Sequence, residues 1–386
     1  MILLVVLGIR PIVWADPLTG QSIVTAVPTS RIGGAKDTLS AIGRIAVSYR
    51  GVVAVTQPQD FTVMLFDSLG VPVGKIGRKG EAPGEFRRMS GAMIGWIGDT
   101  LWVFERSVGR LSYFQSTGEF LRAEATASTL LPPLHYQGPD DEGWSSSIEA
   151  LAIGGGTIRG VAVAEGRRAP VWLEVGDGGG LPAGALVLAA AGADGRYRRT
   201  LAVLPEPIEC QRKMGTMVVV QVPLCPRSLH AVSPDGARVA VAKPSGEDDY
   251  RVEVREVSLD REIFSVDLRG TAIAVERGAK DRLREELSGG RALPADVERW
   301  LSELPIPDRY PPFDRVLLGA DGTVWVREPQ RPGDSQRWRV FNAWGRGVMV
   351  ASLPEGLDVR WARLDALWGV SEDSDGSEEL VRYVLW

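Results

Sequence analysis

A phrase of short apolar strands and glycine-bearing turns recurs about every 45 to 50 residues along this chain. Its clearest copy has an apolar strand at 99–103, a second strand at 111–114 and a turn that ends at Gly118. Two further copies occupy residues 51–70 and 322–345. A period of this length, built from short alternating strands, is typical of a radial or linear array of small sheets. The repeat therefore predicts an all-β fold.

The two ends of the chain suggest how the array closes. The last repeat, from Val359 to Trp386, offers only three strands, whereas the segment Ile23–Val27 alternates like a strand with no hairpin partner nearby. Pairing this segment into the last sheet would join the chain ends and remove open edges that invite aggregation. The spacing fits six sheets when the blurred third repeat, 148–204, counts as one. We therefore expect a six-bladed β-propeller that is closed by an N-terminal strand joining the last blade.

One stretch interrupts the β pattern between blades four and five. Residues Ala279–Leu287 and Pro294–Leu301 have the apolar spacing of two short amphipathic helices, inside an insert that covers about residues 277–304. Gly289 and Gly290 would end the first helix, and Pro294 fits the first turn of the second. The insert could be a surface decoration or a cap over one mouth of the central channel.

The N-terminal residues resemble an export signal. The apolar run Ile2–Ile9 is too short to span a bilayer, and Val13-x-Ala15 has the small residues of a cleavage site. A first hydrophobic strand is the alternative, because no positive charge precedes the run. We predict a signal peptide at residues 1–15, a single propeller domain at 22–386, no transmembrane segment, and a periplasmic or extracellular location.

The chain has two cysteines, Cys210 and Cys225. They flank the β-prone run Met217–Val222, so a hairpin could bring them together. In an oxidising compartment they would form a structural disulfide. Two buried thiols are the alternative if the protein is not exported.

The charge of the chain argues against nucleic acid as the partner. The formal net charge is -5, whereas phosphate binding needs a cationic face. A nucleic-acid-binding module is therefore the weakest of the functions considered.

Several motifs resemble a known family. They are Gly77–Phe86, the strand at Trp102-Val103, Arg110, and Phe114-x-x-x-Gly118. Together they resemble the NHL-type repeat of six-bladed β-propellers, although Glu105 stands where such repeats usually carry Asp. The helical insert, followed by Pro311–Asp314, Asp321–Glu328 and a Tyr383 strand, is similar to a group of exported bacterial six-bladed propellers. Most members of that group have no assigned activity, so the resemblance implies fold and export more than function.

Charged residues in the predicted mouth loops are the candidate binding residues. An arginine fork there would suit a carboxylate or sulfate group. Two alternatives stay open: Glu105 and Arg110 could pair across a hairpin, and the basic loop around Arg78 could be solvated and neutralised by Glu81 and Glu85. The candidates are Arg78, Lys79, Glu105, Arg110, Arg159 and Arg327.

The inventory of catalytic groups is small. The chain lacks GxSxG, GxxxxGK[ST] and GxGxxG motifs. It has only two histidines, His135 and His230, which disfavours a zinc site held by several histidines. We assign no catalytic residue, metal ligand or cofactor. We expect an exported, non-enzymatic propeller that binds a protein or peptide or acts as a scaffold. The alternative is a hydrolase or lyase with a metal, such as calcium, in the central channel.

Overall fold

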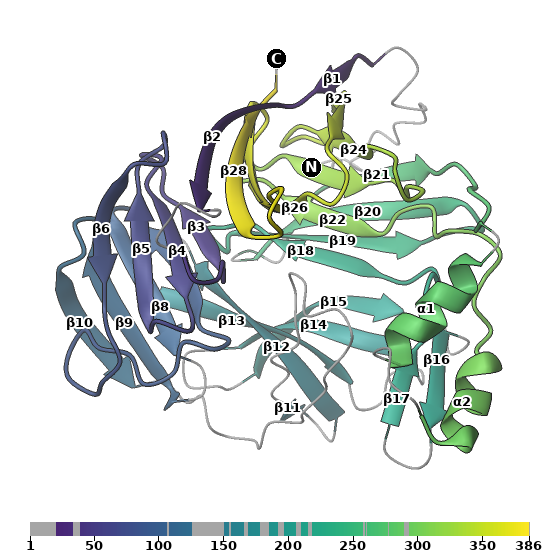
Figure 1. Ribbon diagram of the computed structural model, residues 1–386, viewed down its shortest axis with the longest axis horizontal. Helices are drawn as coiled ribbons and strands as arrows, with labels where there is room; N and C mark the ends of the chain where they lie inside the picture. The colour runs from purple at the N-terminus through teal and green to yellow at the C-terminus, as the bar shows by residue number, and fades with distance from the viewer. Residues whose placement is uncertain are drawn as a thin grey trace, which may run out of the picture.

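In the computed structural model the chain forms β-sheets set around a central space, with two helices at the periphery (Figure 1). The structure describes residues 21–33, 39–105, 108–125, 150–153, 156–165, 169–177, 185–191, 197–205, 210–214, 218–257, 259, 261–276, 278–288 and 293–385, and for most of residues 150–221 it describes the backbone alone. The predicted signal peptide, residues 1–15, lies outside the described residues. Within those ranges, no helix is long and apolar enough to cross a membrane.

Five of the sheets contain the four-stranded antiparallel unit that forms a propeller blade. In four of them the strands follow one another along the chain, as the sequence repeat predicts, and the last takes its fourth strand from the N-terminus. The blades consist of β3 (Ile45–Val47), β4 (Val53–Gln57), β5 (Thr62–Phe66) and β6 (Pro72–Ile76); β7 (Met93–Ile97), β8 (Thr100–Glu105), β9 (Arg110–Gln115) and β10 (Phe120–Ala125); β18 (Leu229–Val232), β19 (Arg238–Pro244), β20 (Asp249–Glu256) and β21 (Arg261–Arg269); β22 (Arg315–Leu318), β23 (Val324–Arg327), β24 (Gln336–Phe341) and β25 (Gly347–Leu353); and β26 (Asp358–Ala362), β27 (Ala366–Glu372), β28 (Glu378–Val384) and β2 (Val27–Gly33).

A larger sheet stands where the third blade was predicted. It has five strands, so the expectation of six blades of one kind was wrong, and the fold is a β-propeller with five four-stranded blades and this sheet. The missed strand is β14, because its alanine-rich sequence has weak β propensity. The strands are β11 (Ala150–Ile153), β12 (Gly156–Glu165), β13 (Ala169–Asp177), β14 (Ala185–Ala191) and β15 (Tyr197–Pro205).

The sheets follow one another around the central space in chain order. Strand β3 lies beside β7 and β26, β7 lies beside β12, β15 lies beside β19, and β18 lies beside β22. Three of these pairs, β3 with β7, β3 with β26 and β18 with β22, join the first strands of neighbouring blades, as the inner strands of a propeller do. The five-stranded sheet instead contacts its neighbours through β12 and β15.

The strand that the N-terminus adds to the last blade is β2, not the predicted segment Ile23–Val27. Strand β2 runs antiparallel to β28, with Ile32 opposite Leu380. The three residues of β1 (Ile23–Thr25) pair in parallel with β25 of the preceding blade instead. Ile32 is buried whereas Ile23 is exposed, so the buried isoleucine identifies the segment that packs into the last blade.

The glycine that closes each copy of the repeat has a conformational role. Gly70 and Gly345 lie at φ +86° and +81°, a left-handed conformation that side chains disfavour. Each amide N–H donates to the carbonyl three residues earlier, that of Asp67 and Asn342 respectively, over 3.0 Å. The Asn342 side chain also accepts from Trp344 N and Arg346 N, which fixes the turn. The sequence repeat is therefore a repeat of one hairpin turn.

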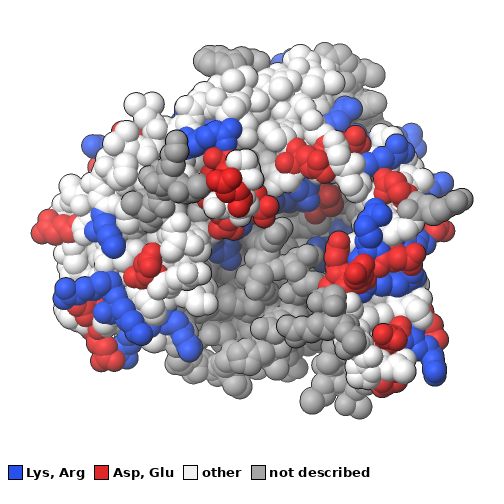
Figure 2. Space-filling model, viewed as in Figure 1, with Lys and Arg blue, Asp and Glu red and all other residues white. Residues whose placement is uncertain are grey.

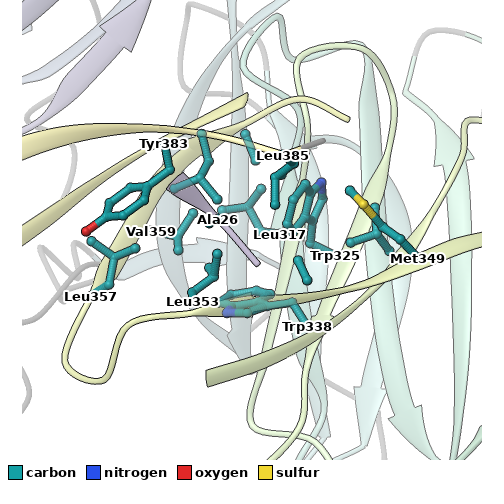
Figure 3. Close-up of a cluster of buried hydrophobic side chains, with 14 of the residues drawn as sticks. Ala26, Leu317, Trp325, Trp338, Met349, Leu353, Leu357, Val359, Tyr383 and Leu385 are labelled. Atoms are coloured by element: carbon teal, nitrogen blue, oxygen red, sulfur yellow. The ribbon is translucent and has the colours of Figure 1, made fainter. Parts of the chain in front are cut away.

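Two tryptophans at equivalent repeat positions, Trp102 and Trp325, are both buried, as expected for core residues. Trp325 packs edge-on against Trp338, with ring centroids 6.4 Å apart (Figure 3). The same cluster includes Ala26 from the N-terminus and Leu385 from the C-terminus. The two chain ends therefore share one core between the last two blades.

The insert forms two helices, as predicted: α1 (Ala279–Ser288) and α2 (Ala295–Ser302). Leu301 and Leu283 belong to an apolar cluster with Val222 and Cys225, next to the hairpin of β16 (Gln211–Met214) and β17 (Val218–Gln221). In Figure 1 the helices lie beside this hairpin at the rim. The helices thus decorate the outside of the ring.

Cys210 and Cys225 form the predicted disulfide, with Cα atoms 5.5 Å apart. It ties the β16–β17 hairpin to the segment that leads into β18.

Reduction of this disulfide should lower the free energy of unfolding by about 3 kcal/mol, because the bridge closes a loop of 15 residues in the unfolded chain. Urea denaturation with and without a phosphine reductant measures the effect. The Cys210→Ser variant should match the reduced protein and show no further response to reductant; a reductant effect that persists in the variant would contradict this assignment.

Candidate functional site

The first strands of the last two blades, β22 and β26, carry the charged residues Arg315, Asp358 and Arg360. Strands β3, β18, β22 and β26 lie toward the centre in Figure 1. Figure 2 shows a hollow near the middle of the molecule, with Lys, Arg, Asp and Glu side chains on part of its wall. We therefore searched for the site where first strands of different blades meet.

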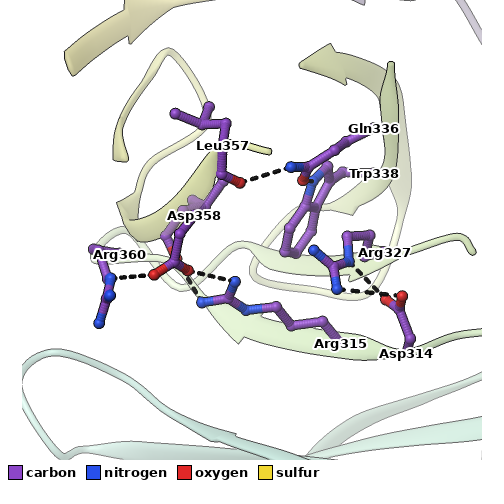
Figure 4. A network of polar contacts seen from close by, with 9 residues as sticks. Asp314, Arg315, Arg327, Gln336, Trp338, Leu357, Asp358 and Arg360 are labelled. Carbon is purple, nitrogen blue, oxygen red and sulfur yellow. Dashed lines mark hydrogen bonds and ion pairs between the residues drawn. The ribbon is translucent and has the colours of Figure 1, made fainter. Parts of the chain in front are cut away.

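Charged side chains from the last two blades meet around Asp358. Arg315 Nη1 donates to Asp358 Oδ1 over 2.6 Å, and Arg315 Nη2 donates to the Val359 carbonyl over 2.8 Å. Arg360 forms an ion pair with Asp358 Oδ2 (Figure 4). The Asp358 carboxylate thus pairs with two guanidinium groups, which come from different strands.

A second pair lies on the adjoining strand. Arg327 donates to Asp314 through Nε over 2.7 Å and Nη2 over 3.2 Å, in the bidentate geometry of an arginine–carboxylate pair. The guanidinium carbons of Arg315 and Arg327 stand 6.0 and 5.8 Å from the ring centroid of Trp338. The buried Trp338 ring therefore packs against both guanidinium groups in cation–π contacts.

A further arginine comes from the first blade. Burial lowers the pKa of Arg44, and the positive charge of Arg360 lowers it further. Burial also lowers the pKa of Arg315, while Asp358 opposes that shift. Each shift means that the surroundings disfavour the charged guanidinium. We define the inner arginine cluster as Arg44, Arg315, Arg327 and Arg360 with Asp314 and Asp358. Three of its guanidinium groups, those of Arg315, Arg327 and Arg360, share the two carboxylates and exceed them by one charge.

Strand geometry explains why these side chains converge. Val316 of β22 pairs with Val326, and Ile45 of β3 pairs with Val55 at the equivalent repeat position. Arg315 is the first residue of β22, and Arg44 directly precedes β3, so they stand at equivalent places in two different blades. In β26 the pairing skips Arg360, which lies in a β-bulge between Val359 and Trp361. A bulge re-aims a side chain, and such irregularities are frequent at functional sites.

Sequence reasoning found only Arg327 among the six cluster residues. The available signal was an arginine at the start of the first strand in two repeats, as in Gly43-Arg44-Ile45 and Asp314-Arg315-Val316. A polar residue beside a strand is common, so this signal has meaning only when the ring places the strands together.

The predicted residues of the second blade lie together in a different place. Glu105 is fully buried and accepts hydrogen bonds from the backbone N–H groups of Arg87 and Arg88, over 2.6 and 3.0 Å. Arg110 Nε donates to Glu105 Oε2 over 2.7 Å, and Arg110 Nη2 donates to the Glu85 carbonyl over 2.5 Å. Glu105 and Arg110 therefore anchor the loop that precedes β7, which matches the hairpin-pairing alternative.

The other predicted residues are dispersed. Arg78 is exposed and donates to Glu85 over 2.7 Å, and Lys79 lies 5.2 Å from the ring centroid of Phe61. Arg159 is on β12, where the structure describes only the backbone. Arg327 lies in the inner arginine cluster, so the predicted residues do not form one site.

A histidine on β18 and a tyrosine on β20, His230 and Tyr250, have shifted pKa values. Burial, reinforced by the positive charge of Arg227, lowers the pKa of His230 to about 4. The Tyr250 hydroxyl donates to the Arg227 carbonyl over 3.0 Å. Burial raises the pKa of Tyr250, and the charge of Asp314 contributes in the same direction. His230 is therefore neutral at pH 7.

This shift predicts a pH dependence of stability. Between pH 6.5 and about 4 the unfolded chain protonates His230 while the folded protein does not, so stability should fall as the pH is lowered through this window. The loss should be on the order of 2 kcal/mol, because the side chain keeps partial solvent contact. Urea denaturation at pH 7 and pH 4.5 measures it. The His230→Gln variant should show a shallower dependence, and parallel curves for both proteins would contradict the assignment.

The described residues also bear on metal binding. Among them, no group of three or more His, Cys, Asp or Glu side chains is placed to hold a metal ion. Both cysteines are in the disulfide, so neither supplies a thiolate ligand.

Comparisons with known proteins give no family for this chain. No family model matches it, and no curated protein matches it. Three solved structures are similar over nearly the whole length. The first is a member of the DUF4221 family from Bacteroides vulgatus, with 9% identity, coverage of 95% of this chain and 99% of the other, and a TM-score of 0.46. The second is a presumed exported protein from Bacteroides fragilis, with 10% identity, coverage of 95% and 96%, and a TM-score of 0.42. The third is the calcium-binding protein regucalcin from Agrobacterium tumefaciens, with 9% identity, coverage of 94% and 96%, and a TM-score of 0.39.

Proposed function

We propose that this chain is an exported, non-enzymatic β-propeller that binds a protein or peptide. The observation that carries the proposal is the inner arginine cluster, in which side chains from three blades converge on an interior position. A ring of packed sheets can hold such side chains rigidly, and a preorganised set of polar groups is what a binding site needs.

Export is supported by the disulfide, because such bonds persist in oxidising compartments. Fusing residues 1–20 to a reporter enzyme that is active only outside the cytoplasm tests export directly. We expect activity from this fusion and none from a fusion whose leader carries Leu4→Arg and Val6→Arg; equal activity from both would contradict the signal peptide.

Binding is tested by affinity capture from the envelope fraction of the organism that makes the chain. The bait is the purified disulfide-bonded protein, and the matched control is the same protein unfolded and immobilised at equal density. We expect a protein that the folded bait alone retains and that binds again when both partners are purified. Failure of every retained protein to bind the purified bait would overturn the proposal.

The metal-centred hydrolase or lyase is tested separately. Elemental analysis of the purified protein, before and after dialysis against calcium, would reveal a stoichiometric metal if this alternative holds.

A further inference from the structure

We propose that the inner arginine cluster binds a carboxylate group of the partner, so that the ligand is an acidic peptide segment. This inference rests on the proposed function and specifies the chemistry of the partner at the same site.

The charge balance of the cluster is the first argument. Arg315 and Arg360 share the single carboxylate of Asp358, while Arg327 engages Asp314 through both of its bonds. Arg44 lies close enough to Arg360 to experience its charge. Because Arg315, Arg327 and Arg360 share only two carboxylates, an incoming carboxylate would supply the third negative charge.

Available donors are the second argument. Arg315 Nε is buried and has no hydrogen-bond partner among the described residues. Its guanidinium plane is fixed by Asp358, the Val359 carbonyl and the Trp338 ring, so the donor direction is fixed as well. A fixed arginine fork recognises planar oxyanions such as carboxylates in bidentate geometry.

Access is the third argument. The side chains of Arg315 and Arg360 retain 16% and 18% exposure, so solvent reaches them although each is ion-paired. A charged hydrogen bond in such a sheltered position is stronger than one on an open surface.

The size of the cluster favours a peptide over nucleic acid. Arg315, Arg327 and Arg360 around two aspartates leave one positive charge for a single anionic group. Nucleic acid instead needs an extended cationic face, and the chain carries a net charge of -5. A single acidic side chain or a chain-terminal carboxylate would satisfy the cluster.

The test uses the full-length protein with its disulfide intact and a fluorescein-labelled hexaglutamate peptide with an amidated C-terminus. Fluorescence anisotropy should show binding of this probe and none of hexaglutamine amide. Hexaglutamine with a free C-terminus separates a terminal carboxylate from acidic side chains as the bound group, and binding of either acid supports the proposal. Affinity should fall as sodium chloride is raised from 50 to 200 mM, because the contact is ionic.

Two variants locate the site. Arg44→Gln and Arg360→Gln should each weaken hexaglutamate binding by about tenfold or more, since each removes a charged donor. The matched control is Arg261→Gln, an exposed arginine that pairs with Glu256 on the outer strand, and its affinity should equal that of the wild type. Equal weakening in all three variants would overturn the proposal.

A second measurement needs no variant, in case the substitutions disturb folding. Phenylglyoxal modifies accessible arginines, and mass spectrometry locates the adducts. Hexaglutamate should protect Arg315 and Arg360 but not Arg261. Protection confined to arginines outside the cluster, or no binding of any carboxylate peptide at low salt, would overturn the inference.

Two further outcomes separate this inference from the proposed function. Sulfate or phosphate binding that depends on Arg360, without any peptide binding, would overturn the assignment to a peptide. A captured partner that binds Arg44→Gln and Arg360→Gln as tightly as the wild type would overturn the inference and leave the proposed function intact.

Discussion

The Glu105→Ala variant should lose about 3–5 kcal/mol of unfolding free energy, one of the largest losses expected from a single substitution in this chain. Glu105 is fully buried and accepts from two backbone N–H groups and the Arg110 guanidinium. Removing the carboxylate leaves a largely buried arginine and two amides without their acceptor. Urea denaturation at pH 7, followed by tryptophan fluorescence, measures the loss.

Two further variants test whether the loss comes from the buried carboxylate of Glu105. Glu105→Gln keeps an acceptor oxygen. Its loss of unfolding free energy should therefore be about 1–2 kcal/mol smaller than that of Glu105→Ala. Glu124→Ala removes an exposed glutamate that also pairs with an arginine, Arg122, and should change stability by no more than about 0.5 kcal/mol. If the two alanine variants behave alike, Glu105 is not the anchor of the loop before β7.

Glu105 also shows how a sequence motif can have a structural meaning. In the first blade, Gln57 occupies the corresponding place at the end of the second strand, is buried, and accepts from Ser40 N over 2.8 Å. Both side chains hold the segment that leads into the first strand of their own blade. Glu105 replaces the usual Asp, and it therefore still provides a buried hydrogen-bond acceptor at this place in the repeat.

Local features were predictable from the sequence because each depends on neighbouring residues. The turns that end at Gly70 and Gly345 need only a glycine and a side-chain acceptor three residues before it. Helices α1 and α2 begin and end within a residue or two of the expected positions, since Pro294 and the apolar spacing act locally. The disulfide was predictable because the β-prone run between the cysteines forms a hairpin strand.

Features that depend on distant residues were missed. The inner arginine cluster joins Arg44 to Arg360, which are far apart in sequence, and the β-bulge at Arg360 has no local signal. The third sheet was misjudged because its fourth strand, the alanine-rich β14, has weak β propensity and gives no clear strand signal. The closing strand was misplaced because Ile23–Val27 alternates like a strand, and only the contact with β28 selects Val27–Gly33.

Removal of the closing strand should have the other large effect. A variant that begins at Gly34 lacks β1 and β2 and should lose at least about 4 kcal/mol of stability, because burial of Ile32 alone contributes about 2–5 kcal/mol. It would also expose the edge of β28, which should promote association. Urea denaturation and light scattering measure the two effects.

The matched variant begins at Ala26 and lacks only β1. It keeps the β2–β28 pairing and should lose about 1–2 kcal/mol, since β1 has three residues and Ile23 is exposed. Equal losses in the two variants would mean that β2 does not close the ring. A large loss for the longer truncation alone would show that stability depends on the antiparallel pairing of β2 with β28, because that pairing ties the chain ends into one sheet.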